Sequence, residues 1–487
     1  MIAATGRPLV RLGLLLALAG CTVGPDFTPP QPAVPDRFTE QSGLAPAAAD
    51  AEDAWWRTLH DALLDRLVAE ARDGSPDLEI AAARVREVRA ERAFTAAEDD
   101  PTIDAGASAT RQHGSANVPI GTPPGGLGPN AGSNLWQAGF DAGWEIDIFG
   151  GVRRAVESAD ASLGNAIENR HDAELILIAE VARDYVELRG AQRRLAIARE
   201  ILDERRDVRG LVAAQFKSGL VGSLDMKRAD SELAASEAEI PGLEAEERAD
   251  IYRLGVLVGK PPEALVGTLD AATPIPDARD PVPAGMPSDL LKRRPDIRAA
   301  EKRIAAANAR IGVAQADLYP HFALTGVAGL ESLNAGELFT TQSHYFAIGP
   351  SVTWLVFDAG RVRDRMAAEQ ARTDQAAADY RKTVLSALAE VETALITYGR
   401  QQVRRDALDR EVAADRDTLD LAKRLYAQGL QDFLAVLDAE RSLHTSEIEL
   451  ADAQRDCALA LIALNKALGG GWGIDTDAGQ PRSAGLG

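Results

Sequence analysis

The sequence is poor in cysteine, in aromatic residues and in basic charge, and each shortage excludes a class of protein. Two cysteines, Cys21 and Cys457, occur among 487 residues, which excludes a disulfide scaffold and a cysteine-based zinc site. Asp and Glu outnumber Lys and Arg by 74 to 53, giving a net charge of −21, so a nucleic-acid partner is not expected. Aromatic residues make up 5%, so something other than an aromatic-rich core must organise the chain.

Long hydrophobic runs are also absent beyond the N-terminus. An uncharged apolar run at 12–19 follows Arg7 and Arg11 and is shorter than the roughly 20 residues that a membrane-spanning helix needs. A basic start followed by such a run is typical of a signal peptide. Residues 1–20 are therefore predicted to be a signal peptide, and no later segment is predicted to be a transmembrane helix.

The end of the apolar run predicts lipidation. Leu18-Ala19-Gly20-Cys21 resembles the bacterial lipobox, in which the cysteine is acylated and becomes the new N-terminus. We expect a covalent lipid on Cys21 and a lipidated tether over 21–54. Thr22 follows the cysteine, instead of the Asp that holds many such lipoproteins at the inner membrane, so the resemblance implies sorting to the outer membrane. Loss of the signal removes two arginines, so the mature charge becomes −21 − 2 = −23.

The rest of the chain repeats itself. Pro76-Asp77-Leu78 and Pro295-Asp296-Ile297 are separated by 219 residues. Further landmarks recur at a separation of 210, namely Trp144 with Trp354, Gly219 with Gly429 and Gly259 with Gly469. The sequence therefore predicts one duplicated unit instead of three domains. The first repeat is placed at 55–280, the second at 281–470, and a flexible tail at 471–487.

Each repeat contains a very long helical segment. Residues 151–218 and 361–428 lack proline and are rich in Ala, Leu, Glu and Arg; as helices they would each reach about 100 Å. Segments of this length without internal caps indicate a coiled coil. Shorter helical segments are predicted at 223–258 and 296–318. Packing of these helices through Ala, Leu and Val explains the low aromatic content. The predicted fold class is mainly α with a small β part.

Between the helical segments the hydrophobic period changes from 3.6 to 2. Trp136, Phe140 and Trp144 share one face of a predicted strand, whereas Gln137 and Asp141 share the other. Such alternation over a membrane-spanning length predicts a lipid-facing side and a polar side. A small soluble sheet is the alternative interpretation. The four strands are predicted at about 102–111, 135–147, 320–331 and 345–357.

Four strands cannot close a transmembrane barrel. Open edges are not tolerated in lipid, and the smallest spanning barrels use eight strands. The chain must therefore oligomerise if its strands span a membrane: two copies would supply eight strands and three would supply twelve. A twelve-stranded barrel begins to leave a lumen, and the long helices would then project into the periplasm.

Four motifs carry a resemblance to a known family. They are TVGPD at 22–26, WEIDIFG at 144–150, LKRRPDIRAAE at 291–301 and FDAGR at 357–361. Together with the lipobox and the two repeats, they resemble TolC-like outer membrane efflux proteins, in particular the NodT-type lipoprotein branch that serves resistance-nodulation-division pumps. The resemblance covers nearly all of the mature chain.

The resemblance implies a fold and a set of partners. It implies a homotrimer in which four strands per chain build a 12-stranded transmembrane β-barrel, continued by a long periplasmic α-helical barrel. A periplasmic adaptor (membrane fusion protein) and an inner-membrane resistance-nodulation-division pump would feed this passive duct in the cell outer membrane. The duct would export small molecules from the periplasm or the pump to the exterior. The exported substrate and the particular pump are not readable from the sequence.

The resemblance also points to two helix-turn-helix tips as adaptor contacts. The residues are Gly219, Leu220, Ser223 and Asp225 in the first tip and Gly429 and Leu430 in the second. Gly219 and Gly429 can end a helix in a left-handed C-cap, and Ser223 with Asp225 can cap the helix that follows. The alternative interpretation is that these residues are helix caps and nothing more.

The second tip is the expected periplasmic gate. Tyr426 and Asp438 match the family's gating residues, but Gln431 stands at its arginine position and Ala435 at one of its aspartate positions. The ionic latch of the family is therefore not reproduced. We predict a gate of Asp432 or Asp438 rings with weaker cross-links, because three equal carboxylates repel one another and attract cations. Solvated acids at helix ends are the alternative.

Other chemistry is poorly supported. The six histidines show no paired or HExxH spacing, so no metal site is predicted. A Gly-rich segment at 125–132 is not framed by a strand and a helix, so it is interpreted as a loop. We expect no enzyme activity and no cofactor apart from the lipid. Two functional alternatives remain: a duct in a type I secretion or major-facilitator assembly, and a lipid-anchored periplasmic coiled-coil scaffold.

Overall fold

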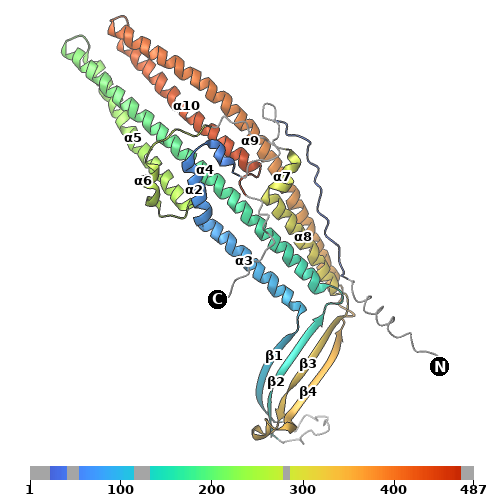
Figure 1. The fold of residues 1–487 in the computed structure, drawn as a ribbon. Coiled ribbons are helices and arrows are strands. Elements are labelled where there is room, and N and C mark those ends of the chain that lie inside the picture. Colours follow the sequence, from blue (N-terminus) through green and yellow to red (C-terminus); the bar gives the residue numbers. More distant parts are fainter. Residues whose placement is uncertain (1–21, 41–53, 114–131, 278–285, 473–487) are drawn as a thin grey trace. The chain divides into compact units, whose positions relative to one another are not determined.

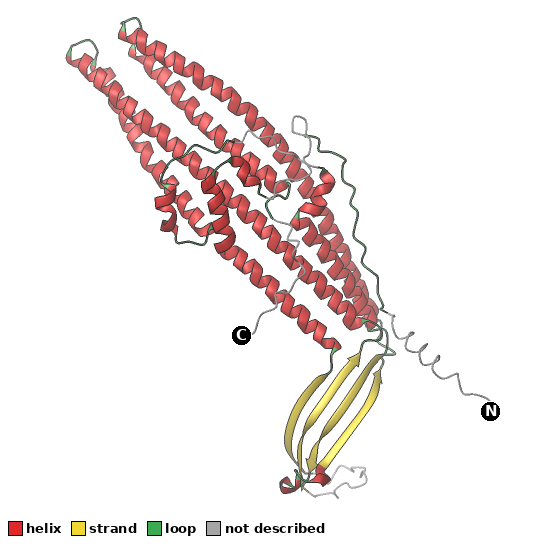
Figure 2. Ribbon diagram, in the orientation of Figure 1, coloured by secondary structure: helices red, strands yellow, loops and turns green. Residues whose placement is uncertain are grey.

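The computed structural model describes residues 22–40, 54–113, 132–277 and 286–472. The signal peptide, the lipidation candidate Cys21, part of the tether and residues 473–487 lie outside this range. Within it the chain is mainly helical, with one small antiparallel sheet (Figure 2). In the described segments, no helix is both long enough and apolar enough to cross a membrane.

The helices of the described residues fall into long and short classes (Figure 1). The longest are α4 and α9, with 67 residues each, and α5 and α10, with 35 residues each. The α-helices are α2 (Ala62–Gly74), α3 (Pro76–Ala96), α4 (Gly151–Lys217), α5 (Ser223–Leu257), α6 (Val266–Leu269), α7 (Pro287–Arg293), α8 (Pro295–Ala316), α9 (Arg361–Ala427) and α10 (Phe433–Ala467). Short 3-10 helices are η1 (Trp55–Leu59), η2 (Ala97–Asp99), η3 (Pro262–Leu265), η4 (Ala335–Glu337) and η5 (Thr341–Ser343).

Helix α4 shows how these segments pack with few aromatic side chains. Its fully buried residues include Ile178, Val181, Ala182, Tyr185 and Leu188, which are spaced three and four residues apart. This spacing places them on one face of a helix with 3.6 residues per turn. A helix of 67 residues is about 100 Å long, so it offers such a face to several partners along its length.

The sheet has the order β1-β2-β3-β4, and all neighbouring strands are antiparallel. The strands are β1 (Thr102–His113), β2 (Gly132–Ile146), β3 (His321–Ser332) and β4 (His344–Thr353). Among the described strands, β1 pairs with β2 alone and β4 with β3 alone, so the sheet has two free edges. The predicted extension of the last strand to residue 357 is wrong. Thr353 pairs with His321, the first residue of β3, so the following residues have no opposite strand.

Two tryptophans, one in β2 and one directly after β4, bond to the backbone that precedes each strand pair. The indole Nε1 of Trp144 donates to the carbonyl oxygen of Asp99 at 2.8 Å. In the same way, Nε1 of Trp354 donates to the carbonyl oxygen of Leu318 at 3.2 Å. The two tryptophans are 210 residues apart in the sequence. The two strand pairs therefore share one anchoring device.

The described chain forms two compact units. The described residues within Met1–Pro30, Arg86–Asn165 and Ala300–Asp379 form the first unit, which holds the sheet. Those within Gln31–Val85, Ala166–Ala299 and Tyr380–Gly487 form the second. Each unit takes segments from both predicted repeats, so the duplication in sequence does not produce two separate compact bodies. The long helices α4 and α9 each supply residues to both units.

Candidate functional site

The second unit contains two turns between long helices: the first turn joins α4 to α5, and the second turn joins α9 to α10. These two turns carry most of the residues that the sequence singled out. Helices α4 and α9 end in the same way: Gly219 and Gly429 each have a φ of 72°. The amide of Leu220 donates to the carbonyl of Gln215 at 3.0 Å, and that of Leu430 donates to Leu425 at 2.9 Å. These bonds define a Schellman motif. The predicted left-handed C-caps are confirmed.

The starts of the next helices differ between the two turns. Helix α10 begins at an N-cap aspartate, Asp432, whose Oδ1 accepts from the amide of Ala435 at 3.1 Å. Helix α5 has Gly222 at the same position, with no side-chain cap bond. The prediction that Ser223 and Asp225 cap α5 is therefore wrong. Both residues already lie inside the first helical turn, whereas a capping side chain must come from the residue before it.

Both turns expose leucine side chains at equivalent positions. Leu220 is 76% exposed and Leu430 is 67% exposed, and Leu224 and Leu434 are also exposed. Each pair is separated by 210 residues in the sequence. Clustered exposed apolar side chains are more informative than scattered ones, because they mark surfaces that bind another molecule.

An apolar cluster connects the two turns beneath these leucines. Tyr426 packs against it, with its ring 5.7 Å from that of Phe433. The hydroxyl of Tyr426 donates to Oε1 of Gln215 on α4, and burial raises the pKa of this phenol. The buried members are Val212, Ala229, Val412, Leu419, Phe433, Val436, Ala439 and Leu443. All four long helices therefore meet in one core near the turns.

The remaining gate candidates are not bonded across helices. Gln431 is exposed, and Asp438 lies 3.8 Å from Arg441 on its own helix. Asp432 is engaged as a helix cap. Within the described part of the chain, neither aspartate forms an ion pair with a different helix. The structure thus brings Tyr426 and Asp432 to the same turn and leaves Asp438 on the exposed side of α10.

A buried polar cluster lies farther along α10, and the sequence analysis missed it. The carboxylate of Glu440 is 3.8 Å from Nζ of Lys423 on α9, and Nε2 of His444 is 3.4 Å from Oε2 of Glu204 on α4. Burial raises the pKa of Glu440, whereas the hydrogen bond from His444 lowers the pKa of Glu204. Glu440 and His444 share a helical face with Val436 and so interrupt an apolar stripe, which is the signal that could have revealed them.

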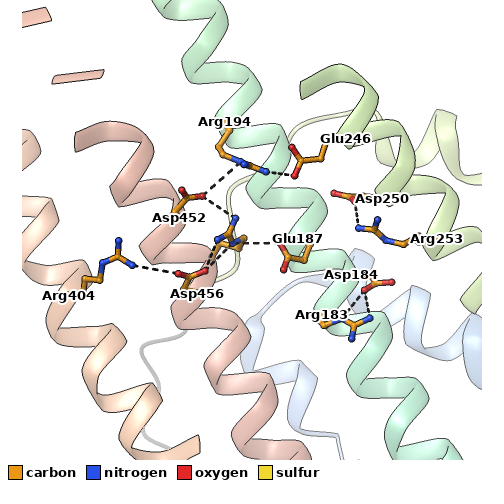
Figure 3. A network of polar contacts seen from close by, with 11 residues as sticks. Arg183, Asp184, Glu187, Arg194, Glu246, Asp250, Arg253, Arg404, Asp452 and Asp456 are labelled. Carbon is orange, nitrogen blue, oxygen red and sulfur yellow. Dashed lines mark hydrogen bonds and ion pairs between the residues drawn. The ribbon is translucent and has the colours of Figure 1, made fainter. Parts of the chain in front are cut away.

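A second polar network joins all four long helices (Figure 3). Arg455 on α10 bonds Asp452 at 3.1 Å and approaches Glu187 on α4 at 3.6 Å. Arg404 on α9 reaches Asp456 at 3.7 Å. The network links helices of the two predicted repeats by charge as well as by apolar packing.

Asp250 on α5 is the most perturbed carboxylate of this region. Its side chain is paired with Arg253, and the residue is 2% exposed. Its pKa is raised to about 6, chiefly by burial; Arg253 lowers it, and the nearby acids Glu246, Glu187 and Asp184 contribute to the rise. A carboxyl with this pKa takes up a proton in the mildly acidic range.

Binding of a metal ion requires a set of donor side chains such as His, Cys, Asp or Glu. In the described residues, no group of three or more His, Cys, Asp or Glu side chains is arranged to hold a metal ion. The cavity beside His444 has a volume of about 250 Å³ and is lined by both acidic and basic side chains.

Comparison with known proteins gives one consistent result. The family model described as "Outer membrane efflux protein" matches residues 67–260 and 286–470. Nodulation protein T of Rhizobium leguminosarum bv. viciae is 32% identical over 478 residues, covering 97% of this chain and 95% of that protein. The pyoverdine export outer membrane protein OpmQ of Pseudomonas putida is 34% identical over 475 residues, covering 96% and 98%.

A solved structure supports the same relationship. The outer-membrane channel OprN superimposes with a TM-score of 0.86 at 36% sequence identity, covering 93% of this chain and 100% of that chain. The coverage is nearly complete for both molecules, so the similarity extends over helices and strands alike.

Proposed function

The chain belongs to the outer membrane efflux protein family, and we propose that three copies of it form the duct of a tripartite efflux assembly. Family membership makes it an outer membrane efflux channel with a periplasmic extension. Among the relatives, OpmQ is an export outer membrane protein and OprN is an outer-membrane channel. The proposal adds the number of copies, the partners and the roles of individual residues.

The open sheet is the main observation that supports the proposed trimer. It has four strands and two free edges among the described residues, and it exposes large apolar side chains, including Phe140 at 61% and Phe346 at 82%. Free backbone edges are not tolerated in lipid. Pairing of β4 with β1 of the next copy closes the sheet, and three copies supply twelve strands, enough for a lumen.

The helices supply the periplasmic part of the duct. Helix α4 begins at Gly151, soon after β2 ends at Ile146. If β2 spans the membrane, the roughly 100 Å of α4 must continue outside it. The matched lengths of α4 with α9 and of α5 with α10 support a duplicated unit. Repeated units in three copies would build a regular α-helical barrel.

The exposed turns are proposed to bind a periplasmic adaptor. Gly219 and Gly429 set the turn geometry, Leu220 and Leu430 offer apolar contacts, and Ser223 and Asp225 complete the polar rim of the first turn. The two turns of each chain are similar but not identical, so three chains would offer six related sites. A resistance-nodulation-division pump in the inner membrane would act through such an adaptor.

The second turn is proposed to close the duct at rest. Tyr426 fixes α9 to α4 through Gln215, and Asp432 or Asp438 would form a ring of like charge around the threefold axis. Gln431, in place of an arginine, cannot form an ionic cross-link. The gate therefore depends on packing and hydrogen bonds more than on salt bridges.

The exported molecule is proposed to be small, without a named substrate. Two relatives with nearly equal sequence identity to this chain are named for different roles, one for nodulation and the other for pyoverdine export. Similarity of this chain to its relatives therefore does not choose a substrate. Co-purification of the native channel identifies the pump, and recovery of a type I secretion or major-facilitator transporter would replace the proposed partner.

The experiment that tests the duct measures mass and conductance. The purified channel is expected to have the mass of three lipidated chains in detergent, and to conduct ions when reconstituted in planar bilayers. Heat-modifiable trimers in outer-membrane fractions would exclude a periplasmic scaffold. A monomer without conductance would contradict the proposal. Metabolic labelling with palmitate tests the lipid on Cys21 separately, with Cys21→Ser as the unlabelled control.

A further inference from the structure

The segment after the lipidation candidate is bound to the first unit in a defined way. Thr22–Asp26 follows Cys21 directly. The amide of Val23 donates to the carbonyl of Phe149 at 3.0 Å. The side-chain amide of Asn308 on α8 donates to the carbonyl of Pro25 at 2.8 Å. The segment is therefore held from both sides, by the residues after β2 and by α8.

Arg154 makes the central contacts with this segment. Its Nε donates to the carbonyl of Val23 at 3.0 Å, and its Nη2 donates to the carbonyl of Gly24 at 3.1 Å and to Oδ1 of Asp26 at 2.7 Å. Its Nη1 donates to Glu157 at 2.6 Å. The Arg154 side chain is 6% exposed. Burying a guanidinium is unfavourable unless its donors are satisfied, and three of these four bonds come from the N-terminal segment.

Glycines make room for the segment. A Cβ added to Gly312 on α8 would lie 2.7 Å from Cγ of Arg154 and 3.0 Å from the carbonyl oxygen of Val23. A Cβ on Gly24 would lie 2.4 Å from Cα of Gly312. A Cβ on Gly150 would lie 2.9 Å from Cα of Thr22. The backbones thus approach more closely than any side chain would allow.

The duplication provides an internal comparison for this site. At the equivalent positions of the other repeat, Asp364 stands for Arg154 and Ala93 stands for Gly312. The turn glycine, in contrast, is present in both repeats, as Gly150 and Gly360, each with positive φ. The fold of a repeat therefore needs the turn glycine but needs neither Arg154 nor Gly312. Those two residues belong to the site for the N-terminal segment.

We propose that Arg154 and Gly312 form a clasp that fixes where the lipid anchor enters the membrane. This inference rests on the proposed lipidation of Cys21 and on the proposed membrane position of β2. Thr22 is in contact with Gly150, just after β2, and Cys21 is one peptide bond away. Trp144, near the end of β2, is the kind of residue that lies at a membrane surface. The clasp therefore holds the anchor at the level where the strands leave the lipid, so that lipid and strands enter the same leaflet together.

A nitroxide label at Thr28→Cys tests the clasp in the full-length channel. Thr28 is exposed, and Cys457 is buried, so the new cysteine is the site to be labelled. The spectrum is expected to show a restrained label in the otherwise native channel. Arg154→Ala and Gly312→Ala are each expected to release it, with a severalfold gain in the mobile component, while palmitate incorporation stays unchanged.

The controls separate the clasp from folding and from lipidation. Arg92→Ala removes an arginine that pairs with Asp160 in the same unit and should leave the spectrum native. Asp26→Ala alters an exposed side chain, so it tests the clasp even if Arg154→Ala does not fold, and it should give a partial gain in mobility. The clasp would be overturned by a label that is already mobile in the native channel. It would also be overturned by a label whose mobility does not change in Arg154→Ala, Gly312→Ala or Asp26→Ala. Absence of palmitate from every variant would overturn lipidation alone.

Discussion

At the residue scale, equivalent positions in the two turns have different roles in helix capping. Gly219 and Gly429 have the same backbone conformation and the same hydrogen bonds. Three residues later the turns diverge, because Gly222 lacks the side chain with which Asp432 caps α10. Asp432 therefore has a structural role of its own, and any gating role must be separated from it.

Two substitutions at Asp432 make this separation. Asp432→Ala removes both the cap and the charge and is expected to cost about 1 kcal/mol of stability. Asp432→Asn keeps a capping oxygen and removes the charge only. If a carboxylate ring holds the gate, both variants should change the closed-state conductance of the reconstituted channel. If only Asp432→Ala changes the conductance, the cap matters for closure and the charge does not. If the double variant Asp432→Ala, Asp438→Ala leaves the closed-state conductance unchanged, the gate lies elsewhere.

Asp250 gives the second prediction at this scale. Its pKa is raised from 3.8 to about 6, so the folded state takes up a proton that the unfolded state takes up only at lower pH. The resulting stabilisation is complete below pH 3.8 and is lost as the pH rises to about 6, with a slope near 1.4 kcal/mol per pH unit. Unfolding at pH 6 and pH 5 should show a gain of about 1 kcal/mol at the lower pH that Asp250→Asn abolishes. Asp203→Asn, on an exposed part of α4, should retain the native dependence of stability on pH.

At the scale of the element, helix length and helix ends are set by different residues. The interior of α4 contains Gly210, and that of α9 contains Gly399, without interruption of either helix. The same residue type ends each helix when it adopts a positive φ, at Gly219 and Gly429. Whether a glycine ends a helix therefore depends on the backbone conformation that it adopts.

The same substitution is predicted to have opposite effects at these two kinds of position. Gly219→Ala and Gly429→Ala force a Cβ into the left-handed region and should each cost about 1 kcal/mol. Gly210→Ala and Gly399→Ala lie in helix interiors where an added Cβ meets nothing within 4 Å, and should each stabilise by up to about 1 kcal/mol. Chemical unfolding of the four variants gives the comparison. Equal signs at both kinds of position would contradict the cap assignment.

At the scale of the whole molecule, the exposed faces of the sheet require explanation. Phe140 and Asp141 are neighbours on β2 and therefore point to opposite faces. In the proposed barrel one face meets lipid and the other meets the aqueous lumen. A charge should be tolerated on the second face but not on the first.

Lysine substitutions at these two positions test the arrangement. Phe140→Lys should destabilise the inserted channel by about 2–4 kcal/mol if the residue lies near the membrane midplane, which reduces the yield of trimer from outer-membrane fractions. Asp141→Lys should leave the yield near the native value and change ion selectivity instead. Similar yields for both variants would indicate that the sheet is soluble.

The local pattern of the sequence predicted most of the elements. The period-two segments around Trp136 and Phe346, the proline-free helical segments and the turn glycines are all local signals, and each is found where local physics places it. The two errors have different causes. The last strand stops at Thr353 because its partner β3 begins at His321. The cap of α5 was misplaced because the helix begins one residue after Gly222, so Ser223 and Asp225 already lie inside its first turn.

The sequence by itself determined the duplication, the alternation of the strands, the lengths of the helices and the family resemblance, because all of these depend on residue order and on short-range periodicity. Only the tertiary structure decided which distant residues meet. Arg154 reaches Val23 across 131 positions, and Tyr426 reaches Gln215 across 211. Such contacts depend on which segments the fold brings onto each long helix, because a helix presents many polar side chains and the fold alone selects the pairs that become buried together.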